Sequence, residues 1–93
     1  MITYNWNKEK NLLLKETREI SFEQIVMHIE MGNLIDIIKH PNQNRYSNQK
    51  MLIININNYI YIVPFVENKK ERFLKTIIKS RQFTKKYLGP KDE

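Results

Sequence analysis

Two strand-like segments that meet at Asn57 and Asn58 constrain this chain more than any other feature. The first, "MLIININ", begins at Met51 and is rich in isoleucine, and the second, "YIYIVPFV", covers 59–66. Because asparagine tolerates positive φ angles, an Asn-Asn pair suits the two-residue turn of a β-hairpin. Apolar side chains occupy both faces of the second segment, which is typical of an inner strand. Pro64 has no N–H to donate, so we expect it near a strand end or a bulge.

Two helices are predicted before this hairpin, after a short strand at 2–6. Asn7 can cap the first helix, which covers 8–17 ("KEKNLLLKET"). Ser21 and Gln24 form the Ser-x-x-Gln capping box of the second helix, and Gly32 ends it. The second helix has one apolar stripe with i, i+3, i+4, i+7 spacing, which consists of Phe22, Ile25, Val26 and Ile29.

The segments that remain complete an α+β fold. A strand at 33–39 precedes the hairpin, the segment 72–80 ("RFLKTIIKS") is predicted to be the last strand, and a helix follows from Ser80 to Gly89. These four successive strands form an antiparallel meander. We therefore predict one domain over residues 1–93, with a sheet of four to five antiparallel strands, two N-terminal helices and a C-terminal helix. We expect the helices to cover one face of the sheet and to leave the other face more open.

The charge distribution points to an anionic partner. The net charge is +6, and the region 69–91 contains nine Lys or Arg residues but one acid, Glu71. Such a region favours a nucleic acid or an acidic protein as partner, although a solvated surface has the same composition. The chain has no cysteine, which excludes disulfides and thiolate metal sites. It lacks an apolar leader and an apolar run of about 18 residues, so we expect a cytoplasmic protein without membrane contact.

The polar segment before the hairpin holds candidate catalytic residues. It reads "KHPNQNRYSNQK" and places His40, Arg45 and Tyr46 within seven residues. Cleavage of RNA by its own 2′-hydroxyl needs a base, an acid and cations that stabilise the phosphorane, and these side-chain types can supply all three. If the α+β fold is right, this loop can lie beside the concave face of the sheet, where it would face Arg81. Alternatively, the segment is only a polar connection between two strands.

The predicted site combines catalytic with RNA-binding residues. The catalytic set is His40, Arg45, Tyr46 and Arg81, and the RNA-binding set is Lys50, Lys79, Lys85 and Lys86. Arg81 and Lys85 share a helix face through their i, i+4 spacing. The two histidines are far apart and no cluster of His or carboxylate residues has ligand spacing, so neither a metal nor another cofactor is expected.

Motifs at both ends of the chain resemble those of BrnT-type toxins from type II toxin–antitoxin systems. At the N-terminal end the matching residues are Trp6, Asn7, Lys10, Asn11, Leu12, Ser21, Phe22 and Glu23. At the C-terminal end they are Ile77, Ile78, Ser80, Arg81, Thr84 and Lys85. The sequence departs from that family in two places: "KET" replaces a Lys-His-Gly where the first helix ends, and Tyr87 replaces an acid in the last helix.

The resemblance implies a RelE/ParE-like fold and a metal-independent endoribonuclease that inhibits translation. It also implies a cognate antitoxin, often of the ribbon-helix-helix type, that covers the basic surface. Whether cleavage involves the ribosome stays open. Two alternatives remain: a ParE-like toxin that acts on a protein target such as a topoisomerase without cleaving RNA, and a plain RNA- or protein-binding module.

Overall fold

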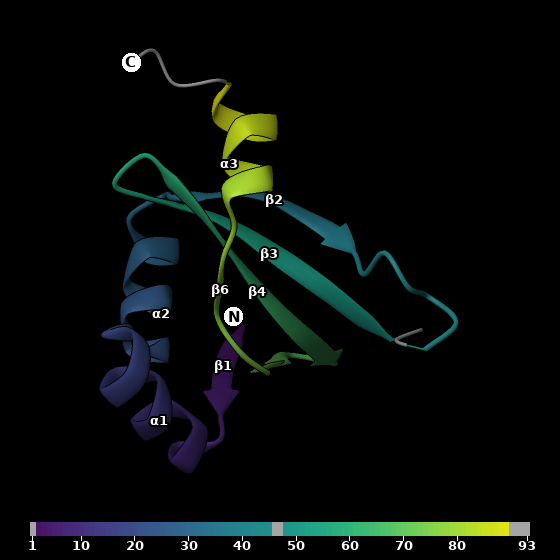
Figure 1. The fold of residues 1–93 in the computed structure, drawn as a ribbon. Coiled ribbons are helices and arrows are strands. Elements are labelled where there is room, and N and C mark those ends of the chain that lie inside the picture. The colour runs from purple at the N-terminus through teal and green to yellow at the C-terminus, as the bar shows by residue number, and fades with distance from the viewer. Residues whose placement is uncertain (1, 46–47, 90–93) are drawn as a thin grey trace.

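A computed structural model gives the fold of residues 2–45 and 48–89 (Figure 1). Its elements are β1 (Thr3–Trp6), α1 (Lys8–Arg18), α2 (Phe22–Glu30), β2 (Leu34–Lys39), β3 (Gln49–Ile56), β4 (Tyr59–Asn68), β5 (Glu71–Leu74), β6 (Ile78–Lys79) and α3 (Arg81–Leu88). The strands form one mixed sheet in the order β1-β5-β4-β3-β2, and β6 pairs with β4. The α+β class and the three helices agree with the prediction. Within the described residues, no helix is long and apolar enough to cross a membrane.

The β3–β4 hairpin is the centre of the sheet, as its sequence predicts. Every residue of β3 has a partner in β4, from the turn to the pair Gln49↔Val66 at the open end. Asn57 and Asn58 connect the strands with φ angles of 54° and 65°, the left-handed conformation that a two-residue hairpin turn needs. The hairpin is therefore a continuous two-stranded platform to which the other elements attach.

The last strand differs from the prediction because it is broken in two. β5 pairs with β4 and, in parallel, with β1, so the sheet is mixed rather than purely antiparallel. The chain leaves the sheet at 75–77 and returns as β6, which pairs with β4 nearer the hairpin turn. The break lies beside Pro64, whose C=O accepts a hydrogen bond from the Lys75 N–H at 2.8 Å. Because Pro64 has no N–H to donate in return, the ladder on this side of β4 stops there.

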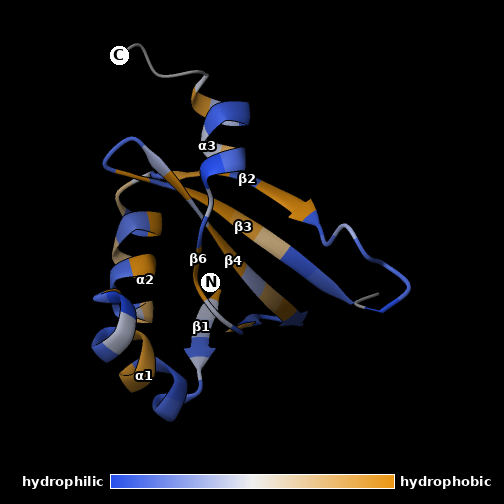
Figure 2. Ribbon diagram, in the orientation of Figure 1, coloured by the Kyte–Doolittle hydropathy of each residue, from blue (hydrophilic) through white to orange (hydrophobic). Residues whose placement is uncertain are grey.

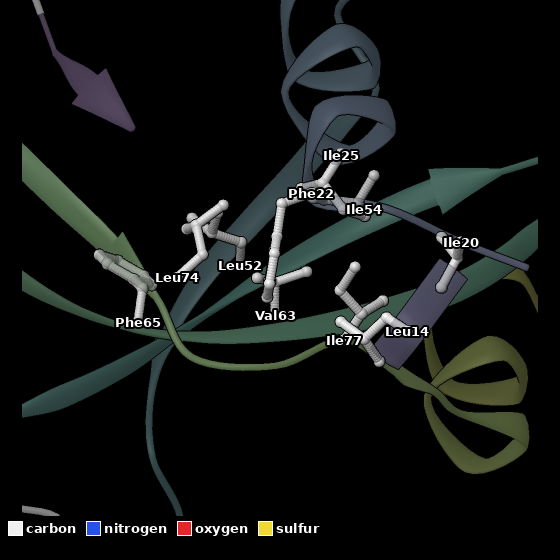
Figure 3. Packing of buried hydrophobic residues seen from close by; sticks show 10 residues of the cluster. All are labelled: Leu14, Ile20, Phe22, Ile25, Leu52, Ile54, Val63, Phe65, Leu74 and Ile77. Atoms are coloured by element: carbon white, nitrogen blue, oxygen red, sulfur yellow. The ribbon is translucent and has the colours of Figure 1, made fainter. Parts of the chain in front are cut away.

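Helices cover both faces of the sheet, whereas the prediction placed them on one. α1 and α2 pack on one face through Leu14, Phe22 and Ile25, and Figure 3 shows these side chains against those of β3 and β4. α3 packs on the other face through Phe83 and Tyr87. The reason lies in the hairpin, because its two strands are apolar on both faces and each face must be shielded from water.

Asn11 joins the two N-terminal helices. Its side chain is buried, its Oδ1 accepts a hydrogen bond from the Phe22 N–H at 2.8 Å, and its Nδ2 donates to Glu23 Oε1 at 2.8 Å. The Phe22 N–H lies in the first turn of α2, where backbone donors have no partner within the helix, so Asn11 satisfies one of them. The predicted capping box of Ser21 and Gln24 is confirmed and pairs a further donor of that turn.

Replacing Asn11 with alanine should destabilise the protein by about 1–3 kcal/mol, because the buried Phe22 N–H loses its partner. Urea unfolding followed by circular dichroism measures this change in the free energy of unfolding. The exposed Asn44 is a matched control, and its replacement by alanine should change stability by less than about 0.5 kcal/mol. Equal effects of the two substitutions would show that Asn11 does not join α1 to α2.

Candidate functional site

The structure divides the predicted site residues into two groups (Figure 1). His40, Arg45 and Lys50 lie at the open end of the hairpin, in or next to the connection between β2 and β3. The second group lies near the hairpin turn, on β6 and α3, and consists of Lys79, Arg81, Lys85 and Lys86. Tyr46 lies outside the residues that the structure describes.

Backbone hydrogen bonds fix the separation of the two groups. The His40 N–H donates to Gln49 O at 3.1 Å, whereas the Ser80 N–H donates to Ile60 O at 3.0 Å. Ile60 pairs with Asn55, which is six residues along β3 from Gln49, or roughly 20 Å of strand. The expectation that the loop faces Arg81 is therefore wrong, and the structure does not bring the two halves of the predicted site together.

Hydrogen bonds to His40 stabilise the conformation of its own loop. Its Nδ1 accepts a hydrogen bond from the Asn42 N–H at 3.1 Å, and its backbone oxygen accepts one from Gln43 Nε2. A neutral imidazole that accepts at Nδ1 carries its proton on Nε2. The ring would have to break this contact before Nε2 could accept a proton, so the geometry favours a structural role of His40 over that of a general base.

A row of polar and charged side chains crosses the sheet at the open end of the hairpin. We call this row the charged row. It contains one residue from each strand in the order β1-β5-β4-β3-β2, namely Tyr4, Arg72, Glu67, Lys50 and Lys39. Residues opposite each other in paired strands, and residues two apart in one strand, point to the same face. The register therefore places the row on the face of Phe65, which belongs to the core under α1 and α2.

Ion pairs and ring contacts hold the charged row in place. Glu67 is central, with Oε1 at 3.6 Å from Lys50 Nζ and Oε2 at 3.4 Å from Arg72 Nε. Arg72 Nη1 donates to the Tyr4 hydroxyl at 3.1 Å, and the guanidinium lies over the Phe65 ring, 5.3 Å from its centroid. The Arg72 side chain is 13% exposed and that of Lys50 is 49% exposed. The carboxylate thus has a fixed arginine on one side and a solvated lysine on the other.

A hollow of about 660 Å³ opens beside the charged row, between the β2–β3 connection and the end of β4. Its lining has three lysines against one carboxylate, together with three side-chain amides, and these residues are Lys39, Lys50, Lys69, Glu67, Gln43, Asn48 and Gln49. Figure 2 shows hydrophilic residues at this end of β3, next to the apolar middle of the hairpin. The volume lies within the range of roughly 300–1,000 Å³ that is typical of small-molecule sites. The excess of lysines over carboxylates in the lining can therefore attract an anionic group.

Sequence reasoning found Lys50 but missed the rest of the charged row. Glu67 follows Phe65 by two positions in β4, and Arg72 is its partner across the β4–β5 turn. Apolar residues alternate along β4 on the face that packs against the core, and this alternation ends at Glu67. A charged residue at a core-facing position could have indicated the site in the sequence. Tyr4 could not be found in this way, because its place in the row depends on the parallel pairing of β1 with β5.

The second group forms a basic surface on α3, and we call Lys79, Arg81, Lys85 and Lys86 the α3 surface. Residues 78–88 contain no acid. Ser80 caps the helix by accepting a hydrogen bond from the Phe83 N–H at 3.0 Å. Thr84 Oγ1 accepts from the Ile60 N–H at 2.8 Å, and Lys79 Nζ lies 4.6 Å from the centroid of the Tyr59 ring. These contacts dock the start of α3 on β4, and the cationic side chains of the α3 surface are exposed.

The far end of α3 is attached to β2, an edge strand of the sheet. The Tyr87 hydroxyl donates to Asp36 Oδ2 at 2.8 Å, while Asp36 Oδ1 accepts from the Ile37 N–H at 2.8 Å. Burial raises the pKa of Tyr87, and the hydrogen bond to Asp36 and the charge of its carboxylate raise it further. The folded state therefore favours the neutral phenol.

The chain matches no protein-family model, no curated protein and no solved structure. Its resemblance to BrnT-type toxins therefore rests on sequence motifs alone. Within residues 2–45 and 48–89, no three His, Asp or Glu side chains come together as candidate metal ligands.

Tyr87→Phe should lower the free energy of unfolding at neutral pH by about 0.5–1.5 kcal/mol, because it removes the hydrogen bond to Asp36. Since the folded-state pKa of Tyr87 is raised, this contribution is fully present below the ordinary tyrosine pKa of about 10 and is lost as the pH rises through the raised value. Urea unfolding of both proteins at pH 7 and above pH 10 tests this. A stability difference that stays constant with pH would contradict the assignment.

Proposed function

We propose that the protein is a ribonuclease toxin similar to the BrnT type and that it cleaves RNA at the charged row. The observation that carries this proposal is the Glu67 carboxylate, which lies between the cations of Lys50 and Arg72 at the edge of the hollow. Cleavage of RNA without a metal needs a proton acceptor, cations close to the phosphate and a proton donor. The charged row contains all three kinds of group.

The reaction follows from these groups. Glu67 accepts the proton of the ribose 2′-hydroxyl while O2′ forms a bond to the phosphorus atom. Arg72 and Lys50 stabilise the charge on the non-bridging oxygens of the phosphorane, as the neutralised Glu67 releases them from its ion pairs. The bond from phosphorus to O5′ then breaks, and the Tyr4 hydroxyl donates a proton to O5′. The products are a 2′,3′-cyclic phosphate and a 5′-hydroxyl.

The spacing of the row fits this assignment. The Tyr4 oxygen accepts a hydrogen bond from Arg72, so the phenolic O–H remains a donor for another group. Tyr4 and Glu67 lie on either side of Arg72, two strand spacings apart, which is roughly 10 Å. A phosphodiester that binds over Arg72 can therefore contact the base on one side and the acid on the other.

A purely structural ion-pair cluster would behave differently on mutation. The pair between Lys50 and Glu67 is partly exposed, and pairs of this kind contribute about 0–1 kcal/mol to stability. A catalytic base contributes far more to a rate than such a pair contributes to stability, because its loss leaves the 2′-hydroxyl proton without an acceptor. The cleavage rate and the free energy of unfolding of the same Glu67 variant therefore distinguish a catalytic role from a purely structural one.

Induced expression should arrest the growth of host cells and yield cut RNA with 2′,3′-cyclic phosphate ends. In purified protein, Glu67→Gln should lower the rate of RNA cleavage by about 10²–10⁴-fold, because an amide cannot accept the proton. Glu16→Gln, at an exposed position of α1, is the matched control and should keep the wild-type rate. Gel assays of a labelled RNA, with and without ribosomes, give these rates.

Intact RNA under both conditions, or a wild-type rate in Glu67→Gln, contradicts the proposal. Growth arrest without RNA cleavage would instead favour the ParE-like alternative, which acts on a protein target. The toxin proposal also includes a cognate antitoxin, expected to be of the ribbon-helix-helix type. Co-expression of an adjacent small reading frame should therefore relieve the arrest.

The α3 surface is proposed to supply RNA-backbone contacts away from the charged row. If Lys85 and Lys86 each neutralise one phosphate of a single strand, replacing both with alanine should make the slope of log affinity against log salt concentration shallower by about 1.4. Fluorescence anisotropy of a labelled single-stranded RNA measures this slope. Replacement of Lys8 and Lys15 on α1 is the matched control. Equal slopes for the two double variants would show that Lys85 and Lys86 do not contact the RNA backbone.

A further inference from the structure

We propose that the hollow beside the charged row binds the terminal phosphate of an RNA strand. The inference deepens the proposed function and rests on it for the identity of the polymer, whereas binding of a phosphorylated end can be measured without cleavage. It is supported by the lysines of the hollow: by their lack of ion-pair partners, by the stability that their positions cost, and by the charge of the anion that they match.

The carboxylate in the lining of the hollow is already neutralised. Glu67 Oε1 lies 3.6 Å from Lys50 Nζ, and Glu67 Oε2 lies 3.4 Å from Arg72 Nε. Both oxygens thus face cations of the charged row. Because the charge of this carboxylate is balanced, the other lysines of the lining determine the electrostatic potential that an entering anion meets.

Lys39 and Lys69 are these other lysines. Lys39 ends the charged row on β2 and points to the same face as Lys50, because the two are opposite each other in the β2–β3 pairing. Lys69 lies in the turn between β4 and β5. Both lysines are exposed, and within residues 2–45 and 48–89 no carboxylate forms an ion pair with either. The hollow therefore has two cations available to a bound anion.

The positions of these lysines cost stability in the free protein. Lys39 and Lys50 place like charges opposite each other in paired strands, which is destabilising. Lys69 has a φ of 52°, in the left-handed region that glycine and asparagine adopt at lower cost. Such costs are concentrated at binding and catalytic sites. A bound anion would offset the repulsion between Lys39 and Lys50, and it would use a charge that glycine at position 69 could not supply.

A phosphomonoester matches the two cations better than a phosphodiester of the RNA backbone does. A phosphomonoester carries a charge of about −1.5 to −2 at pH 7 and three strong acceptor oxygens, whereas each backbone phosphate carries a single negative charge. In RNA, phosphomonoesters occur at the 5′ or the 3′ end of a strand. The hollow, at about 660 Å³, also has room for the ribose next to that phosphate. The subsite therefore directs cleavage to linkages near a phosphorylated end.

Titration of the ¹⁵N-labelled wild-type chain with short RNA strands of one sequence tests the subsite. The strands carry 2′-O-methyl groups, which prevent cleavage, and have a 5′-phosphate, a 3′-phosphate or hydroxyl groups at both ends. One phosphorylated strand, which identifies the recognised end, should bind about two- to thirtyfold more tightly than the hydroxyl strand, if each lysine contributes as much as a partly exposed ion pair. The chemical-shift differences between the two complexes should be largest around Lys39 and Lys69, and inorganic phosphate should shift the same N–H groups.

Variants then assign the preference to side chains. Lys69→Asn removes the cation but suits the left-handed turn, so it should lower the preference for the phosphorylated strand by about two- to fivefold without lowering the free energy of unfolding. Lys39→Met should lower the preference by a similar factor and relieve the repulsion from Lys50. Lys8→Met on α1 removes one exposed lysine elsewhere; it is the matched control and should leave the preference unchanged.

Equal affinities for the phosphorylated and hydroxyl strands, or shift differences confined to other parts of the chain, would overturn the subsite. So would a preference that survives in both Lys39→Met and Lys69→Asn, or one that Lys8→Met lowers equally, since the preference would then reflect net charge alone. The outcome is separate from that of the cleavage assay. Binding of a phosphorylated end by a protein that leaves RNA intact would keep the subsite and refute the ribonuclease, whereas cleavage at a rate independent of the terminal phosphate would do the reverse.

Discussion

The burial of both faces of the β3–β4 hairpin is the interaction on which the rest of the structure depends. Side chains without exposed surface occur on both faces, namely Leu52, Ile53, Ile54, Ile60, Val63 and Phe65. Each contributes about 1.5–3 kcal/mol on burial, whereas the left-handed turn at Asn57 and Asn58 costs about 1–2 kcal/mol per residue. The strain of the turn is therefore small beside the burial that it allows, and the hairpin determines where α1, α2 and α3 must lie.

This burial also decides where polar chemistry can occur. The helices cover the middle of the hairpin on both faces, and the charged side chains of β3 and β4, Lys50 and Glu67, lie at its open end. The charged row occupies the open end, where β1, β5 and β2 extend the sheet sideways, and the α3 surface occupies the end near the turn. An RNA strand that used both surfaces would have to pass along the molecule rather than bind at one place.

Local signals in the sequence predicted much of the fold, and non-local pairing accounts for what was missed. The hairpin turn at Asn57 and Asn58 and the capping box at Ser21 were predictable because their causes lie within a few residues. The parallel pairing of Thr3 with Glu71 joins distant segments, and no short motif encodes it. The same limit applies to the candidate site: the polar loop was visible in the sequence, but the alignment of Arg72 with Glu67 and Lys50 follows from the register of three strands.

The contact between Tyr87 and Asp36 has a consequence for the behaviour of the protein at high concentration. β2 is an edge strand, and Ile35 and Ile37 expose apolar side chains on it, a combination that invites other chains to add strands. The Asp36 carboxylate places a charge on this edge and occupies the Ile37 N–H, a donor that an added strand would need. Since Tyr87 holds the same carboxylate, the last turn of the C-terminal helix also helps to protect the sheet against self-association.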